Sequence, residues 1–197
     1  MNKKAKINLI EFGAIGAIIL TLFVTGLHTE VLGFLQRGIL ETGMLNPDLE
    51  KKAELAVNDS KSKADFNMTL VNSKGETVNM DEFRGKVIFM NIWATWCPPC
   101  IAEMPGINNL YNDVKEKDVT FIMISVDQNF QKAIDFAEEK GYDFEIYKVQ
   151  GTMPRMYATR AIPTTYVIGA DQTLALTHKG MGDYDTAEFK SFLQNLK

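Results

Sequence analysis

The apolar residues of this chain follow different patterns before and after residue 66. Before it stand one long apolar run and then a polar stretch. After it, short apolar segments of strand length alternate with segments in which apolar residues recur at helical spacing. Strands that alternate with helices predict an α/β domain over residues 66–197, built on a mixed sheet that is covered on both faces.

The segments of this domain can be read one by one. Two short strands flank the turn at residues 72–75 and predict an N-terminal hairpin. Residues 86–94 and 119–127 are almost continuously apolar, which is typical of strands buried on both faces. The other expected elements are helices over 98–117, 129–141 and 184–197, a strand over 144–149, a helical turn over 153–160 and a hairpin over 164–180.

The N-terminal run indicates a membrane anchor. Residues 7–27 carry Glu11 as their single charge, and three lysines precede them: Lys3, Lys4 and Lys6. A helix of this length spans roughly 30 Å, the thickness of a bilayer core. The lysines favour a cytoplasmic N-terminus, which places the rest of the chain outside the cytoplasm. The alternative is a signal peptide that is cleaved near residues 24–26.

Residues 28–65 separate the anchor from the α/β domain. The apolar residues of 29–43 lie close to helical spacing, with charged residues between them. Three placements remain open for this helix: on the membrane surface, packed on its own domain, or as a continuation of the anchor. Residues 46–65 are polar and predict a linker. The chain therefore divides into an anchor over 1–27, a connecting segment over 28–65 and a domain over 66–197.

Charge and cysteine content exclude several classes of function. The net charge is −4 and the 21 basic residues are scattered, so no basic surface predicts nucleic-acid binding. Two cysteines cannot build a disulfide framework. A zinc site needs about four protein ligands, and the distant His28 and His178 complete the cysteine pair poorly. We therefore expect no metal site.

The stretch WATWCPPC, residues 93–100, holds both cysteines and both tryptophans of the chain. Cys97 stands at the start of a predicted helix, where the helix dipole and free N–H groups favour a thiolate. Cys100 follows one turn later, where it can close a disulfide with Cys97. Pro98 and Pro99 lack N–H groups that could stabilise the Cys97 thiolate. Because strong oxidants owe their potential to a stabilised reduced form, this predicts a reducing couple.

The longer stretch NIWATWCPPCIAEMP resembles the membrane-tethered TlpA/ResA-like thiol–disulfide oxidoreductases, and residues 66–197 look like the thioredoxin superfamily. The resemblance implies a thioredoxin-like fold, with Cys97 as the attacking cysteine and Cys100 as the buried resolving cysteine. It implies that Pro105 kinks the active-site helix and that Pro163 is a cis-proline facing the disulfide. The substrate contacts that follow from it are Trp96, Pro98, Pro99, Ile162 and Pro163.

Two departures from thioredoxin itself point to the ResA-like group. Asn91 stands where thioredoxin has a buried aspartate, and it cannot accept a proton. Glu103, three residues after Cys100, matches the acidic residue of ResA-like proteins and is the expected proton acceptor. Residues 129–147 supply an additional helix and strand between Cys97 and Pro163, as in the TlpA/ResA group.

These observations predict a membrane-bound reductant of protein disulfides that faces the periplasm or the cell exterior. It needs no cofactor beyond the Cys97–Cys100 disulfide. The resemblance implies a membrane thiol carrier of the CcdA/DsbD type as electron donor, and apocytochrome c or another envelope protein as acceptor. One rival is a thiol peroxidase, which wants a threonine or serine where Ala94 stands. The other is a binding module without turnover.

Overall fold

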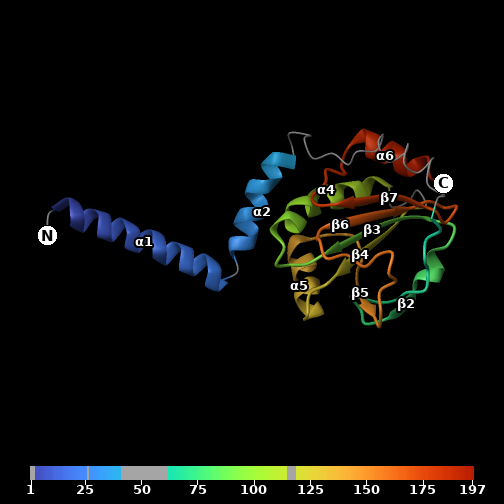
Figure 1. Ribbon diagram of the computed structural model, residues 1–197, viewed down its shortest axis with the longest axis horizontal. Coiled ribbons are helices and arrows are strands. Elements are labelled where there is room, and N and C mark those ends of the chain that lie inside the picture. The colour runs from blue at the N-terminus through green and yellow to red at the C-terminus, as the bar shows by residue number, and fades with distance from the viewer. Residues whose placement is uncertain (1–2, 26, 41–61, 115–118) are drawn as a thin grey trace.

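The structure is a computed structural model that describes residues 3–25, 27–40, 62–114 and 119–197. Two helices, α1 (Lys3–Thr25) and α2 (Leu27–Leu40), precede an α/β domain (Figure 1). Most of the predicted linker, the end of the predicted helix over 98–117 and part of the alternative cleavage site lie outside the described residues.

The described residues of the domain form a seven-stranded mixed sheet in the order β2-β1-β5-β4-β3-β6-β7. Strands β3, β4 and β5 are parallel, and the other neighbouring pairs are antiparallel. The predicted hairpins are the pairs β1–β2 and β6–β7, one at each edge of the sheet. The strands are β1 (Thr69–Asn72), β2 (Thr77–Asn79), β3 (Val87–Trp93), β4 (Val119–Ser125), β5 (Ile146–Gln150), β6 (Thr164–Ile168) and β7 (Leu174–Lys179).

One face of the sheet carries the α-helices of the domain: α4 (Pro98–Val114), α5 (Phe130–Lys140) and α6 (Ala187–Gln194). They share a core with alternate residues of the strands, such as Phe89 of β3 and Phe121 of β4. Helix α4 connects β3 to its parallel neighbour β4, and α5 connects β4 to its parallel neighbour β5. Both connections therefore step in the same direction across the sheet. Right-handed crossovers therefore place both helices on the same face.

The opposite face is covered by shorter elements. Its core joins the other alternate strand residues, such as Ile88 and Met90, to the 3-10 helix η1 (Met80–Phe83), Phe66 and Tyr157. The helical turn predicted over 153–160 is a single turn, in which the N–H groups of Tyr157 and Ala158 donate to the carbonyl of Pro154. Both faces are thus covered as predicted, but by different kinds of structure.

Capping residues set both ends of helix α5. The side chain of Asn129 accepts a hydrogen bond from the N–H of Gln131 and caps the first turn. Gly141 follows the last turn with φ 66°, a left-handed conformation that glycine adopts without strain. Together with β5, this helix forms the predicted insertion between β4 and β6.

Ordered pairing begins slightly before the predicted start of the domain. Lys63 forms an isolated antiparallel bridge with Thr173. The N–H of Ala64 donates to the carbonyl of Gln172, and the N–H of Leu174 donates to the carbonyl of Ser62. The last residues of the polar stretch therefore lie along the turn that precedes β7.

Helix α1 exposes large apolar side chains, including Phe12, Ile18 and Val24. In the described part of the chain, however, no helix has both the length and the apolar character that a membrane crossing needs. The structure therefore does not confirm the predicted anchor. Helix α2 packs against α4 (Figure 1). Of the three placements left open for this segment, the observed one is packing on its own domain.

Candidate active site

The two cysteines lie where β3 passes into α4. Strand β3 ends at Trp93, the N–H of Cys97 donates to the carbonyl of Ala94 at 3.2 Å, and α4 begins at Pro98. Cys97 and Cys100 form a disulfide with a Cα–Cα distance of 5.3 Å. Cys97 is 4% exposed and Cys100 is completely buried. The predicted pairing and the predicted position at a helix N-terminus are both present.

The sulfur of Cys97 meets few hydrogen-bond donors. It accepts from the N–H of Cys100 at 3.3 Å. Pro98 and Pro99 occupy the two positions between the cysteines and carry no N–H. The first turn of α4 therefore offers this sulfur fewer donors than an ordinary helix N-terminus would.

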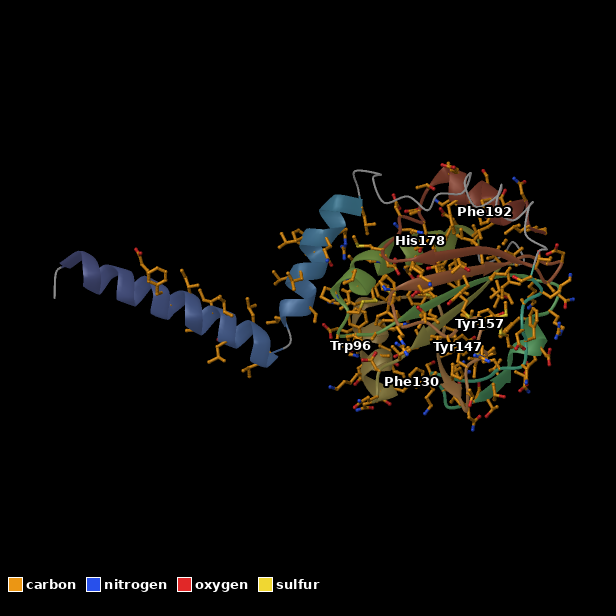
Figure 2. All side chains as sticks on the ribbon, in the orientation of Figure 1. Trp96, Phe130, Tyr147, Tyr157, His178 and Phe192 are labelled. Carbon is orange, nitrogen blue, oxygen red and sulfur yellow. A yellow bond between two sulfur atoms is a disulfide. The ribbon has the colours of Figure 1, made fainter. Side chains whose placement is uncertain are left out.

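The two tryptophans of the motif face different surroundings. Trp93 is fully buried in the helix-covered core and packs on Phe136, with ring centroids 5.8 Å apart. Trp96 is 59% exposed. Figure 2 shows it at the end of the domain that faces α2, where it lines an open groove of about 540 Å³ together with Leu27 and Ile101.

Asp127 fixes the loop that precedes the cysteines. Its carboxylate accepts from the N–H of Thr95 at 2.9 Å and from the hydroxyl of Thr95 at 2.7 Å. It also accepts from the hydroxyl of Ser125 at the end of β4 at 2.9 Å. The loop between β3 and α4 is therefore tied to the end of the neighbouring strand.

The Ile162–Pro163 peptide is cis, as the resemblance implied. Pro163 is buried and its carbonyl accepts from the N–H of Gly180 at 2.9 Å. Ile162 is half-buried and packs against the core that contains both cysteines. Pro98 and Pro99 are half-buried at the start of α4. Pro105 lies inside the same helix.

Glu103 lies one helical turn after Cys100 and is almost entirely buried, with 2% of its surface exposed. One carboxyl oxygen accepts from the amide nitrogen of Asn91 at 2.8 Å, and the other accepts from the N–H of Gly182 at 3.1 Å. Burial raises the pKa of Glu103 from 4.5 to about 8, although both hydrogen bonds act in the opposite direction. This carboxyl therefore titrates near the pKa of an ordinary thiol, about 8.5.

A chain of buried polar groups continues from Glu103 into the sheet. Asn91 of β3 also donates to the hydroxyl of Thr165 at 2.9 Å, and the hydroxyl of Tyr184 donates to the same oxygen at 2.8 Å. Burial, and then the charge of Glu103, raise the pKa of Tyr184. Sequence reasoning missed Thr165, Gly182 and Tyr184 because they come from distant parts of the chain.

A cavity of about 280 Å³ opens beside Glu103. Its wall includes Pro105 and Asn109 of α4, Asp183 and Asp185 of the loop before α6, and Arg37 and Leu40 of α2. Within the described ranges, no cluster of three or more histidine, cysteine or acidic side chains is placed to hold a metal ion. The chemistry that this arrangement supports is thiol–disulfide exchange at Cys97 and Cys100, with a buried carboxyl one helical turn after the second cysteine.

Comparison with known proteins agrees with this chemistry. The redoxin family matches residues 56–194. The thiol–disulfide oxidoreductase ResA of Halalkalibacterium halodurans is 31% identical over 130 residues, which cover 65% of this chain and 74% of the relative. ResA of Bacillus cereus is 28% identical over 131 residues, covering 66% and 75%.

Solved structures show the same fold at lower sequence identity. StoA from Bacillus subtilis is 22% identical, with a TM-score of 0.53, and the match covers 63% of this chain and 93% of that one. A thiol:disulfide interchange protein DsbE from Chlorobium tepidum is 24% identical, with a TM-score of 0.56, covering 70% and 96%. The mixed sheet, the position of the cysteines and these relatives agree: the chain belongs to the redoxin family and is a ResA-like thiol–disulfide oxidoreductase of the thioredoxin superfamily.

Proposed function

We propose that this oxidoreductase reduces disulfides in other proteins. The observation that carries the proposal is the scarcity of hydrogen-bond donors around the sulfur of Cys97. This sulfur accepts from the N–H of Cys100, and the next two residues in the chain are prolines, which carry no N–H. A thiolate with few donors is less stable, so the dithiol gives up its electrons more readily. The oxidised form is correspondingly favoured.

In the proposed reaction, the Cys97 thiolate attacks one sulfur of the substrate disulfide. That bond breaks, a mixed disulfide forms, and the other substrate sulfur leaves as a thiolate that takes a proton from water. The Cys100 thiolate then attacks the Cys97 sulfur and releases the second substrate thiolate. Two electrons pass to the substrate, and the Cys97–Cys100 disulfide remains on the enzyme.

Glu103 is proposed to accept the proton of Cys100 before the second attack. Cys100 is completely buried, and burial in protein resists ionisation of a thiol. The carboxyl of Glu103 follows one turn later on the same helix, with a pKa of about 8. Proton transfer between groups of similar pKa is efficient. Asn91 cannot take this role because its amide does not accept a proton.

The redox potential tests the direction of the reaction. The enzyme is equilibrated with glutathione buffers, and the fraction of oxidised Cys97–Cys100 is measured. We expect a value nearer to that of thioredoxin, about −270 mV, than to that of DsbA, about −120 mV. A value above about −180 mV, the level of protein disulfide isomerase, would contradict a reducing role. An assay of insulin reduction separates an enzyme from a binding module, which would show no turnover.

We also propose that residues 1–27 attach the enzyme to the cytoplasmic membrane as a single-pass anchor, with the domain in the periplasm or at the cell exterior. The support comes from the sequence: the apolar run over 7–27 follows three lysines and contains one charge. Retention in the membrane fraction after a carbonate wash is the expected result, and complete release would contradict it. A reporter that is active only in the cytoplasm should be inactive when it is fused after Leu27.

The electron donor and the substrate follow from this location. In an oxidising compartment the enzyme must be reduced again, and we propose a membrane thiol carrier of the CcdA/DsbD type as its donor. Apocytochrome c or another envelope protein is the proposed acceptor. Cys100→Ser leaves the attacking cysteine in place and removes the resolving one. The variant should therefore retain the substrate as a mixed disulfide, which mass spectrometry can identify.

A further inference from the structure

Helix α2 lies directly on the active-site helix. It packs along the first half of α4, and its last residue, Leu40, is 6% exposed (Figure 1). The contact is close at Gly33, where an added Cβ would lie 3.2 Å from Cγ2 of Ile101 and 3.3 Å from the carbonyl oxygen of Pro98. In the sequence, Pro98 directly follows Cys97 and Ile101 directly follows Cys100. A segment that precedes the domain is therefore part of the surroundings of the redox site.

The same helix completes the wall of the cavity beside Glu103. Arg37 and Leu40 of α2 line this cavity together with Glu103 itself. Nε of Arg37 is buried and makes no hydrogen bond among the described residues. Removal of α2 would open the cavity to solvent on the side where these two residues stand.

We propose that α2 is a positioning element of the active site: docked on α4, it limits the access of water to Glu103 and thereby controls proton transfer from Cys100. The proposal rests on the role of Glu103 given above. It concerns how that carboxyl is kept in its buried state, to which Arg37 and Leu40 of α2 contribute as part of the cavity wall. Burial is the largest cause of the raised pKa of Glu103. A change in the burial of this carboxyl should therefore change its pKa.

The charged and titratable groups around Glu103 determine the sign of this change. They are Arg37 from α2, Cys100 from α4, and Asp183, Tyr184 and Asp185 from the loop before α6. Withdrawal of Arg37 would by itself raise the pKa of the carboxyl, because a cation favours the carboxylate. Arg37 is not among the causes that set this pKa, whereas burial is the first of them. Undocking of α2 should therefore lower the pKa of Glu103.

The glycines of α2 offer a matched pair of variants. Gly33→Leu places a branched side chain against Ile101 and the backbone of Pro98, so the two helices must separate. Gly38→Leu makes the same change in the same helix, at a position where an added Cβ meets nothing within 4 Å. Both substitutions favour the helical conformation equally, so they differ chiefly in the contact with α4.

The titration of Glu103 is followed through the infrared band of its protonated carboxyl, identified as the band that Glu103→Gln removes. In the full-length Gly33→Leu protein we expect its midpoint to fall by about one pH unit or more. The pH profile of disulfide reduction should shift in the same direction. Leu40→Ser opens the cavity wall without touching Gly33 and should also lower the midpoint. Gly38→Leu should titrate like the wild type.

Arg37→Met distinguishes the effect of burial on Glu103 from the effect of the Arg37 charge, because methionine keeps most of the side-chain volume and removes the cation. It should not reproduce the downward shift. Unchanged midpoints in both Gly33→Leu and Leu40→Ser would overturn the proposal, as would a full downward shift in Arg37→Met. Wild-type rates in Glu103→Gln would instead contradict the proposed catalytic role of Glu103. The infrared midpoints decide the role of α2 in either case.

Discussion

The two cysteines of the active site lie three residues apart and have different surroundings. Cys97 follows the exposed Trp96, which lines the open groove, and the described donor to the Cys97 sulfur is one backbone N–H. Cys100 is completely buried, and the carboxyl of Glu103 follows it on the helix. One turn of helix thus separates a cysteine next to an exposed aromatic residue from a cysteine that a buried carboxyl follows. The comparison teaches that a single turn can give the two cysteines of one disulfide different polar surroundings.

Exchange of each cysteine for serine should have the largest effect and should distinguish the two cysteines. Cys97→Ser should abolish turnover and form no mixed disulfide, because the attacking sulfur is missing. Cys100→Ser should also abolish turnover, but it should accumulate one substrate chain per enzyme. Non-reducing electrophoresis with insulin as substrate measures both outcomes. Equal amounts of mixed disulfide in the two variants would remove the distinction.

Glu103→Gln should slow the step at Cys100 without affecting the reactivity of Cys97. The glutamine keeps the shape and removes the base, so resolution of the mixed disulfide should slow by about 10³-fold. Alkylation of Cys97 should stay close to the wild-type rate. Stopped-flow measurements between about pH 6 and about pH 9 test this, with the exposed Glu188→Gln as control. Wild-type rates for Glu103→Gln over this range would show that the carboxyl takes no part.

The stability of the oxidised protein should depend on pH through the same residue. The folded pKa of Glu103, about 8, lies above its ordinary value of 4.5, so the folded state binds more protons between these values. The free energy of unfolding should therefore fall as pH rises through this window, by at most about 1.4 kcal/mol per pH unit. Below the window the contribution of Glu103 is fully present.

Glu103→Gln should remove this part of the pH dependence. Denaturant unfolding of the two proteins at several pH values gives the difference directly, because the other carboxyl groups are common to both. Parallel curves for the wild type and the variant would show that Glu103 ionises normally in the folded protein.

Trp96→Ala should produce the smallest effect, and it should affect only the reaction with protein substrates. Loss of an exposed aromatic contact should lower kcat/KM for a protein disulfide about fivefold, which corresponds to about 1 kcal/mol. A small disulfide reagent should react at the wild-type rate, and Tm should not change. Trp93→Phe provides the contrast, because Trp93 is buried and its truncation should lower Tm. A fivefold loss with the small reagent as well would place Trp96 in the chemistry instead of in substrate binding.

The parts of the fold that depend on local pattern were predictable from the sequence. Continuous apolar runs gave β3 and β4, Asn129 and Gly141 limit α5, and the cysteines lie at the start of α4 as expected. Local pattern does not give the side of the sheet on which a helix packs. It also left three placements open for α2, because an amphipathic helix can cover a membrane or a protein surface equally well.

The active site likewise contains residues that local sequence identifies and residues that it does not. Cys97, Cys100 and Glu103 stand within seven residues and could be identified together. The groups that hold the carboxyl could not, since Gly182 lies 79 residues from Glu103 and contributes a backbone N–H that any residue except proline would carry. Thr165 meets Asn91 through the pairing of β6 with β3, and Tyr184 reaches Thr165 through the return of the chain after β7. Such contacts follow from tertiary structure alone.

The three hydrogen bonds that Asp127 accepts have a consequence for the binding of substrates. Two of them hold Thr95 by its backbone and its side chain, and the third ties Asp127 to Ser125, so the residue next to Trp96 is fixed before any partner arrives. Fixing the backbone of one residue costs about 1–2 kcal/mol of conformational entropy at 25 °C. Here that cost is met during folding and not at each encounter. A partner that contacts this loop therefore loses less of its binding free energy to the ordering of the enzyme.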